Sequence, residues 1–371
     1  MPLPRVAVAF EYTSVHGGER SLLAAGEALR DRFDLTALAP AAGPLADALT
    51  AAGWPVVGCD VKEPASLMRA LATVRPDLLH GNSLSVGRAL GRIKSELPCA
   101  VTAHLRDILN LSRTAVRDLG RCDRLIAVSA ATRAHHVGRG LPADRTVVVH
   151  NGIDREAFLK GVNRAAARAS VRNELGAPAD AQLLLTVGQV GLRKGWDVLA
   201  AAFEHLPRSP SEPFSSPPHL LAVGERWSRK AESVRFEEDV LAALNRHAPG
   251  RALRLGTRSD VPRLMAASDL LVHPARQEPF GRVLLEAAAA GLPIVAAPVG
   301  GTAEMLRNAF APFPPGDSRT LAAQIARVLA NESERTRLAT AASRRVRRFT
   351  VAQAAAGLAT AWDQVLDSLN S

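Results

Sequence analysis

Short apolar runs alternate along this chain with longer segments that have helical periodicity. The first run, residues 6–10, reads Val-Ala-Val-Ala-Phe and precedes a helical pattern over about 19–32. The same order starts again at residues 183–187, before a helix expected over 196–205. Strands that are apolar throughout are buried on both faces, and their alternation with helices is typical of a parallel, doubly wound sheet. The chain is therefore predicted to be α/β, with ligands bound beyond the carboxyl ends of its strands.

The length of 371 residues favours two domains, since a usual domain is about a third to a half as long. A proline- and serine-rich segment, residues 205–219, is interpreted as an exposed loop. The expected strands are 6–10, 35–40, 55–59, 78–82, 99–104, 125–129 and 146–150, then 183–187, 220–224, 253–256, 270–273 and 294–297. The expected helices include 19–32, 44–52, 65–74, 85–96 and 130–138, then 196–205, 318–330, 332–346 and 351–370.

Residues 278–291 are predicted to form one short helix with a carboxylate just before it. Pro279 suits a first helical turn, and Gly291 with Pro293 supplies a stop. Glu286 is the one residue of 283–290 that is not apolar, so it needs a partner. Free N–H groups at the helix start attract anions. A nucleotide sugar fits this layout, with diphosphate at the helix end and polyols on the carboxylates; a buried helix whose Glu286 pairs with an arginine is the alternative.

The run Glu-Pro-Phe-Gly-x-x-x-x-Glu at 278–286 resembles the E-x7-E signature of retaining glycosyltransferases of family 4. The resemblance implies the GT-B architecture, two Rossmann-like domains that face a cleft. Residues 1–163 would form the acceptor-side domain, 164–349 the nucleotide-sugar-binding domain, and a helix over about 350–371 would cross back to the first. Glu278 would contact sugar hydroxyls near the reacting carbon and Glu286 the ribose diol. The residues between them assigned to the donor site are Pro279, Phe280, Gly281 and Arg282.

Residues 188–195, Gly-Gln-Val-Gly-Leu-Arg-Lys-Gly, resemble the family's G-R-x-x-x-x-K-G segment, whose arginine and lysine grip the donor diphosphate. Lys194 falls on the lysine position, and a solvated surface cation is the alternative. Gln189 stands where arginine is usual, and Arg193 is the hypothetical source of the missing charge. Cations are needed there because the leaving nucleoside diphosphate gains negative charge as the glycosidic bond breaks.

Two features of the first domain lie where a ligand is expected. Gly17-Gly18 follows the first strand, where glycine lets the backbone approach a ligand closely; a tight turn is the alternative. His104 ends the strand 99–104, at the carboxyl edge of the sheet. In the family a histidine near this place contacts the donor sugar, which implies that role for His104. A satisfied polar side chain is the other interpretation.

Further segments follow the family's order. Residues 151–154, Asn-Gly-Ile-Asp, resemble its N-G-[IV]-D corner and are interpreted as a structural turn. Residues 256–260 resemble its loop near the nucleobase, which implies Arg258 as a base contact. Residues 300–304 resemble its G-G-x-x-E segment, where glycines ahead of a helix let phosphate or sugar approach the backbone. The residues assigned to the donor there are Gly300, Gly301 and Thr302.

The net charge of +10 invites a nucleic-acid or membrane interpretation. Aromatic residues make up only 4%, and no stretch interleaves them with basic residues, so nucleic acid is not an expected partner. The recurring arginines Arg113, Arg117, Arg121 and Arg124 suggest either a peripheral contact with an anionic membrane or a solvated helix face. No apolar run approaches the ~18 residues that a membrane span needs, and three cysteines without C-x-x-C suggest no disulfide framework or zinc site.

The sequence therefore predicts a cytoplasmic, metal-independent retaining glycosyltransferase, peripheral at the inner membrane face in one interpretation. No Asp-x-Asp pair occurs, which agrees with a metal-free scheme. No cofactor is expected besides the donor, which is UDP- or GDP-linked, and the acceptor would be a glycan, a lipid-linked molecule or a small molecule. A nucleotide-sugar epimerase or phosphorylase of the same architecture and a non-catalytic sugar-nucleotide-binding protein are the alternatives.

Overall fold

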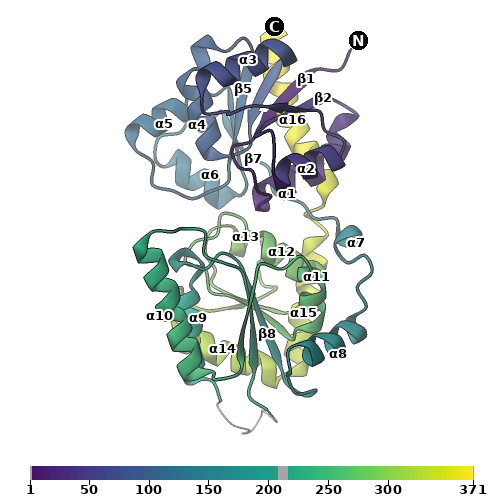
Figure 1. Cartoon of the computed structure of the whole chain (residues 1–371), viewed down its shortest axis with the longest axis vertical. Helices are drawn as coiled ribbons and strands as arrows, with labels where there is room; N and C mark the ends of the chain where they lie inside the picture. Colours follow the sequence, from purple (N-terminus) through teal and green to yellow (C-terminus); the bar gives the residue numbers. More distant parts are fainter. Residues whose placement is uncertain (1, 208–215, 371) are drawn as a thin grey trace. The chain divides into compact units, whose positions relative to one another are not determined.

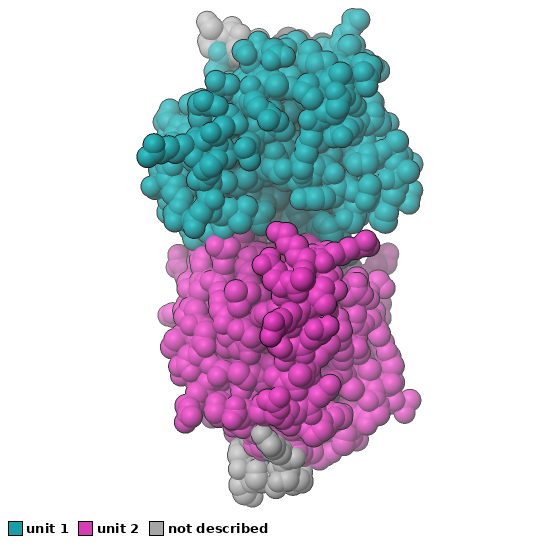
Figure 2. Space-filling view, turned by 60° about the vertical axis from the view of Figure 1, so that its left-hand side comes forward, with its two compact units in different colours: residues 1–154, 349–371 teal, residues 155–348 magenta. Residues whose placement is uncertain are grey.

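The computed structural model describes residues 2–207 and 216–370, so part of the loop predicted over 205–219 lies outside the described residues. The chain divides into two compact units (Figures 1 and 2). Unit 1 is Met1–Asp154 with Phe349–Ser371, and unit 2 is Arg155–Arg348. Sequence analysis puts this boundary later, after residue 163. The segment in between belongs with unit 2 because α7 (Arg155–Phe158) packs on α12 (Arg282–Ala289) and Arg155 Nε donates to the carbonyl of Ala289 at 3.0 Å.

Unit 1 contains a parallel sheet in which the described residues form seven strands, in the order β3-β2-β1-β4-β5-β6-β7. The strand order reverses between β1 and β4, which pair directly, with Ala9 opposite Gly81. Ligands of open α/β sheets bind beyond the carboxyl ends of the strands at such a reversal. The elements are β1 Arg5–Ala9, α1 Gly17–Arg30, β2 Asp34–Ala39, α2 Pro44–Ala51, β3 Val56–Gly58, α3 Pro64–Val74, β4 Leu78–Gly81, α4 Leu84–Arg92, β5 Ala100–Leu105, α5 Arg113–Leu119, β6 Arg124–Ala127, α6 Ala130–Val137, β7 Thr146–Val148 and α16 Val351–Asn370.

Both faces of this sheet are apolar, because successive side chains of a strand point to opposite faces. Val6 and Val8 of β1 pack in one cluster with α1, α2 and α16, whereas Ala7 and Ala9 pack in another with α3 and α4. The C-terminal helix α16 thus completes the core of the first unit. Its Trp362 is fully buried and lies edge-on to Phe33, with ring centroids 5.2 Å apart.

In unit 2 the described residues form six parallel strands, in the order β10-β9-β8-β11-β12-β13. Here the order reverses between β8 and β11, where Leu184 and Leu185 lie opposite Leu270 and Leu271. The elements are α7, α8 Arg164–Glu174, β8 Leu183–Val187, α9 Trp196–Ala202, β9 His219–Val223, α10 Ala231–His247, β10 Ala252–Gly256, α11 Val261–Ala267, β11 Leu270–His273, α12, β12 Ile294–Ala296, α13 Gly301–Leu306, β13 Ala311–Pro312, α14 Ser318–Ala330 and α15 Glu332–Val346.

The predicted parallel α/β fold is confirmed, and each predicted strand is present. The helices α7, α8 and α10 and the short strand β13 are not predicted from the sequence, and α5 is expected only as a helix face without bounds. Within residues 2–207 and 216–370, no helix combines the length and the apolarity that a membrane crossing requires.

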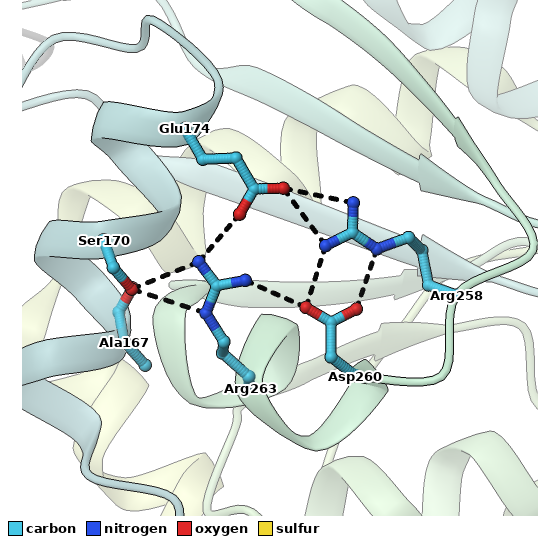
Figure 3. Close-up of polar contacts among 6 residues, drawn as sticks. All are labelled: Ala167, Ser170, Glu174, Arg258, Asp260 and Arg263. Atoms are coloured by element: carbon cyan, nitrogen blue, oxygen red, sulfur yellow. Dashed lines mark hydrogen bonds and ion pairs between the residues drawn. The ribbon is translucent and has the colours of Figure 1, made fainter.

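A ring of alternating charges joins α8 to the segment between β10 and α11 (Figure 3). Asp260 accepts from Arg258 Nε at 2.7 Å and from Arg263 Nη1 at 2.9 Å. Glu174 accepts from Arg258 Nη1 at 3.1 Å and from Arg263 Nη2 at 2.7 Å. The guanidinium of Arg258 is therefore held by two carboxylates, and its predicted contact with a nucleobase stays a prediction.

Replacing Asp260 with Asn is expected to lower the free energy of unfolding by about 1–2 kcal/mol at neutral pH. Hydrogen bonds from Arg258 and then Arg263 lower the pKa of Asp260 to about 2 from its ordinary 3.8. A lowered pKa contributes stability that is complete above the unfolded-state value and lost as the pH falls through the folded-state value. Urea unfolding at pH 7 and pH 3 measures both effects, and the loss caused by Asp260→Asn should be smaller at pH 3.

Asp239→Asn is the matched control, because Asp239 is exposed on α10 and accepts no side-chain hydrogen bond or ion pair from the described residues. A loss for Asp260→Asn that equals the control, or that does not change with pH, would contradict a stabilising role for the charge ring.

Candidate functional site

Glu278 is the centre of a buried polar cluster at the strand-order reversal of unit 2. It follows β11 and is 5% exposed. Its Oε2 accepts from Lys194 Nζ at 2.6 Å and from His273 Nε2 at 2.7 Å. Lys194 follows β8 and His273 ends β11, so the two strands that meet at the reversal supply all three side chains.

The carboxyl of Glu278 is ionised in this cluster. Burial alone would raise its pKa, but Lys194 and the hydrogen bond from His273 outweigh burial and hold the pKa well below its usual range. Burial lowers the pKa of His273, which is therefore neutral near pH 7. Because a carboxylate can only accept, the single ring proton of His273 lies on Nε2. The cluster thus contains one ion pair and one neutral donor.

Arg193 adds a second cation beside the ion pair. Its positive charge helps to lower the pKa of His273, which places the guanidinium within electrostatic reach of the cluster. No hydrogen bond or ion pair from its side chain to another described residue is formed. Cations with unused hydrogen-bond donors beside a buried carboxylate suit an anionic ligand such as a diphosphate.

Arg276 ties the loop after β8 to the loop after β11. Its Nη1 and Nη2 each donate to a carboxylate oxygen of Asp197 at 2.7 Å, and its backbone N–H donates to the carbonyl of Arg193 at 2.9 Å. A bidentate arginine–carboxylate pair fixes geometry as well as distance. The segment that carries Arg193 and Lys194 is therefore held against the segment that leads to Glu278.

The predicted helix over 278–291 begins later than expected, at Arg282. Gly281 has φ 98°, a left-handed conformation that residues with a side chain rarely adopt, so Pro279 and Phe280 belong to the preceding loop. Glu286 accepts from Arg282 Nη2 at 3.1 Å across one helical turn. Glu286 thus has a partner in the arginine four residues before it, and its predicted contact with the ribose diol stays a prediction.

The glycine segment 300–302 lies against the Glu278 loop. The N–H of Gly301 donates to the carbonyl of Glu278 at 2.9 Å. Thr302 is fully buried in α13, and its hydroxyl has no hydrogen-bond partner among the described residues. The structure therefore brings the Lys194, Glu278 and Gly300–Thr302 segments together in unit 2, as the sequence predicts.

The candidate residues of unit 1 lie near the strand-order reversal of the other sheet, after β1 and on β5. Gly17 and Gly18 form the first turn of α1 and not a separate loop. A Cβ added to Gly18 would lie 2.9 Å from Cδ of Arg106, so this glycine makes room for that side chain. His104 is 4% exposed near the end of β5 and contacts Arg106, whose Nη2 lies 3.2 Å from Nδ1 of His104.

Sequence reasoning missed His273 and Arg106 as site residues. His273 ends a predicted strand, so its place at the carboxyl edge of the sheet is the signal that could have found it. Arg106 follows the strand of His104 by two residues, and a charged residue there carries the same signal. In residues 2–207 and 216–370 no group of three His, Cys, Asp or Glu side chains is arranged to hold a metal ion.

Of the arginines suggested for a membrane contact, Arg113 and Arg117 are exposed on α5. Arg124 lies instead on β6, and its Nη1 donates to Gln364 of α16. The membrane contact stays a prediction.

Two relatives show how far the sequence likeness extends. The D-inositol 3-phosphate glycosyltransferase of Xylanimonas cellulosilytica is 34% identical over 233 residues, which cover 61% of this chain and 52% of that protein. The UDP-Gal:alpha-D-GlcNAc-diphosphoundecaprenol alpha-1,3-galactosyltransferase of Escherichia coli is 25% identical over 307 residues, or 76% of each protein. The chain thus spans 52% and 76% of the lengths of these two relatives.

Solved structures share the fold. Anabaena HepE in complex with UDP and glucose matches with a TM-score of 0.84 at 24% identity, covering 97% of this chain and 100% of that one. WaaG, a glycosyltransferase involved in lipopolysaccharide biosynthesis, matches with a TM-score of 0.70 at 20% identity, covering 95% and 98%. Together with the two parallel sheets, these matches establish the GT-B architecture.

Two family models match the chain, one in each unit. The family described as Glycosyltransferase Family 4 matches residues 15–157, and the family described as Glycosyl transferases group 1 matches residues 167–345. Both units are thus accounted for by one family of enzymes, and the chain belongs to the group 1 glycosyltransferases of family 4.

Proposed function

We propose that this chain transfers a sugar from a UDP-linked donor to an acceptor hydroxyl, with retention of anomeric configuration and without a metal ion. The observation that carries the proposal is the buried Lys194–Glu278–His273 cluster, with Arg193 beside it, at the strand-order reversal of unit 2. Anabaena HepE, a structure of the same fold, contains UDP and glucose, which supports the choice of uridine. The acceptor is proposed to be a glycan, a lipid-linked molecule or a small molecule.

The proposed roles follow from charge. As the bond between the anomeric carbon and the diphosphate oxygen breaks, the diphosphate takes the electron pair and gains negative charge. Lys194 and Arg193 would stabilise that charge. Lys194 would then lie between two anions, the diphosphate and Glu278. The new bond forms from the same carbon to the acceptor oxygen, whose proton is released.

Glu278 is proposed to orient sugar hydroxyls. Its Oε2 is occupied by Lys194 and His273, whereas Oε1 accepts no hydrogen bond from the described residues. An ionised carboxylate fixed by two donors is a rigid acceptor, because its rotamer and its charge are both set before the sugar arrives. Glu286, hydrogen-bonded to Arg282 on α12 with its side chain 15% exposed, is proposed to contact the ribose diol.

Glu278→Gln is expected to lower kcat by roughly 100-fold, on the scale of losing one preorganised electrostatic contact. The amide keeps the shape of the side chain but removes the charge that pairs with Lys194. Glu286→Gln should instead raise KM for the donor with a smaller change in kcat, because a ribose contact is made equally in the ground and transition states. Initial rates with varied UDP-sugar concentration measure both. Wild-type kcat in Glu278→Gln would overturn the assignment.

Lys194→Met and Arg193→Met are each expected to weaken UDP binding by roughly tenfold or more, the scale of a lost hydrogen bond to a charged group. Thermal unfolding with and without UDP measures this, because a ligand of the folded state raises the melting temperature. GDP and ADP serve as comparison ligands. Lys230→Met is the matched control, since Lys230 is an exposed lysine just before α10.

An equal UDP-induced shift in Arg193→Met and Lys230→Met would show that Arg193 does not replace the arginine absent at position 189. No shift of the wild-type protein with any nucleotide would contradict the proposed donor. Product analysis with and without an acceptor separates transfer from epimerisation, phosphorolysis and binding without turnover.

A further inference from the structure

Three polar side chains interrupt an apolar layer in unit 1. His80 on β4 and Thr102 and His104 on β5 lie on the sheet face that α1 and α16 cover. His80 and Thr102 are fully buried and His104 is 4% exposed. Their neighbours on the same face include Leu78 and Ala100, and the ring of Trp362 lies 5.3 Å from that of His80. Buried polar groups cost free energy unless hydrogen bonds compensate them.

The hydrogen bonds among these groups run in one direction. Arg106 Nη2 lies 3.2 Å from Nδ1 of His104, and a guanidinium can only donate, so this Nδ1 is an acceptor without a proton. Nε2 of His80, 2.8 Å from the same Nδ1, is then also a donor. Because the neutral imidazole has one proton, Nδ1 of His80 is an acceptor. It accepts a hydrogen bond from the hydroxyl of Thr102 at 2.8 Å.

Both rings are neutral. Burial and the nearby Arg106 lower the pKa of His80 to about 3. Burial, Arg106 and His80 hold the pKa of His104 well below its usual range. The single proton of His104 therefore lies on Nε2, which has no hydrogen-bond partner among the described residues.

His104 also lines a cavity of about 20 Å³ with Arg106, His150 and Asn151, inside unit 1. A cavity of this size holds about one water molecule. The ring of His104 thus lies near the carboxyl end of its strand and lines this cavity, with Nδ1 bonded inside the protein and Nε2 bonded to no described residue.

We propose that His80 is a positioning residue, which holds His104 as the neutral tautomer that donates from Nε2 to a hydroxyl of a substrate bound at the carboxyl edge of the sheet of unit 1. The inference rests on the proposed glycosyl transfer and assigns His80 a part in it. His80 itself touches no substrate. Thr102 supports it by donating a hydrogen bond to Nδ1 of His80, and Arg106, which donates to the carbonyl of Asn82 at 2.9 Å, supplies the second donor to His104.

A purely structural role would not need this polarity. Apolar side chains of similar shape at both histidine positions would match the surrounding layer, and replacing both partners of a buried hydrogen bond is often nearly neutral. The hydrogen bonds run from Thr102 through His80 to His104. This direction places the single proton of His104 on Nε2.

The experiment compares His80→Gln with His80→Leu in the full chain. The glutamine amide can donate to Nδ1 of His104, whereas leucine cannot. We expect kcat of His80→Leu to fall by roughly tenfold, the scale of one net hydrogen bond, with KM for the donor nearly unchanged. His80→Gln should stay within about threefold of the wild type. Nitrogen-15 NMR of the imidazoles reports the tautomer directly, and His80→Leu should increase the fraction of His104 protonated at Nδ1.

Several outcomes would overturn the proposal. One is His80→Leu with wild-type kcat and an unchanged His104 tautomer, and another is His80→Gln as impaired as His80→Leu while circular dichroism and UDP-induced stabilisation are normal. If His80→Leu does not fold, a comparison of Thr102→Val with Thr102→Ser tests the hydrogen bond between Thr102 and His80 instead. Absence of transfer by the wild-type protein would count against the proposed function, and the tautomer spectra would still decide the role of His80.

Discussion

The ion pair between Lys194 and Glu278 is the interaction on which the candidate site depends. A carboxylate this deeply buried is stable only with partners, and removing one partner of a buried pair typically costs about 3–5 kcal/mol because the other charge is left uncompensated. Lys194 follows β8 and Glu278 follows β11, so the pair also joins two loops that are far apart in the sequence. The carbonyl of Glu278 meanwhile receives the N–H of Gly301, and a third loop is joined to the same residue.

The two sheets follow one plan. Each reverses its strand order once, between β1 and β4 in unit 1 and between β8 and β11 in unit 2, and the candidate residues of each unit lie on or after strands near that reversal. The chemistry of the two places differs. Unit 2 presents cations around a carboxylate, which suits a diphosphate and a sugar, whereas unit 1 presents neutral imidazoles beside one guanidinium.

Much of this was predictable from the sequence because parallel strands and their loops leave local signals. The strands are apolar throughout, and the Lys194, Glu278 and Gly300–Gly301 segments each follow one of them. The hydrogen-bond partners of the candidate residues are harder to predict. His273, the partner of Glu278, looks like the end of an apolar strand. Glu174, a partner of Arg258, is distant from it in sequence. The start of α12 was placed too early because Pro279 suits a first turn, and the left-handed φ of Gly281 is a property of the folded backbone.

Helix α16 has a consequence for how the protein is made. Unit 1 needs Trp362 and its neighbours for its core, yet these residues follow all of unit 2 in the chain. Unit 2 is one continuous segment, whereas the sheet face of unit 1 that α1, α2 and α16 cover is completed only when α16 has been made. Unit 2 can therefore be completed before unit 1, the opposite of the usual order in which the N-terminal domain is completed first. The apolar layer around His80, which includes Trp362, is complete only once α16 is in place.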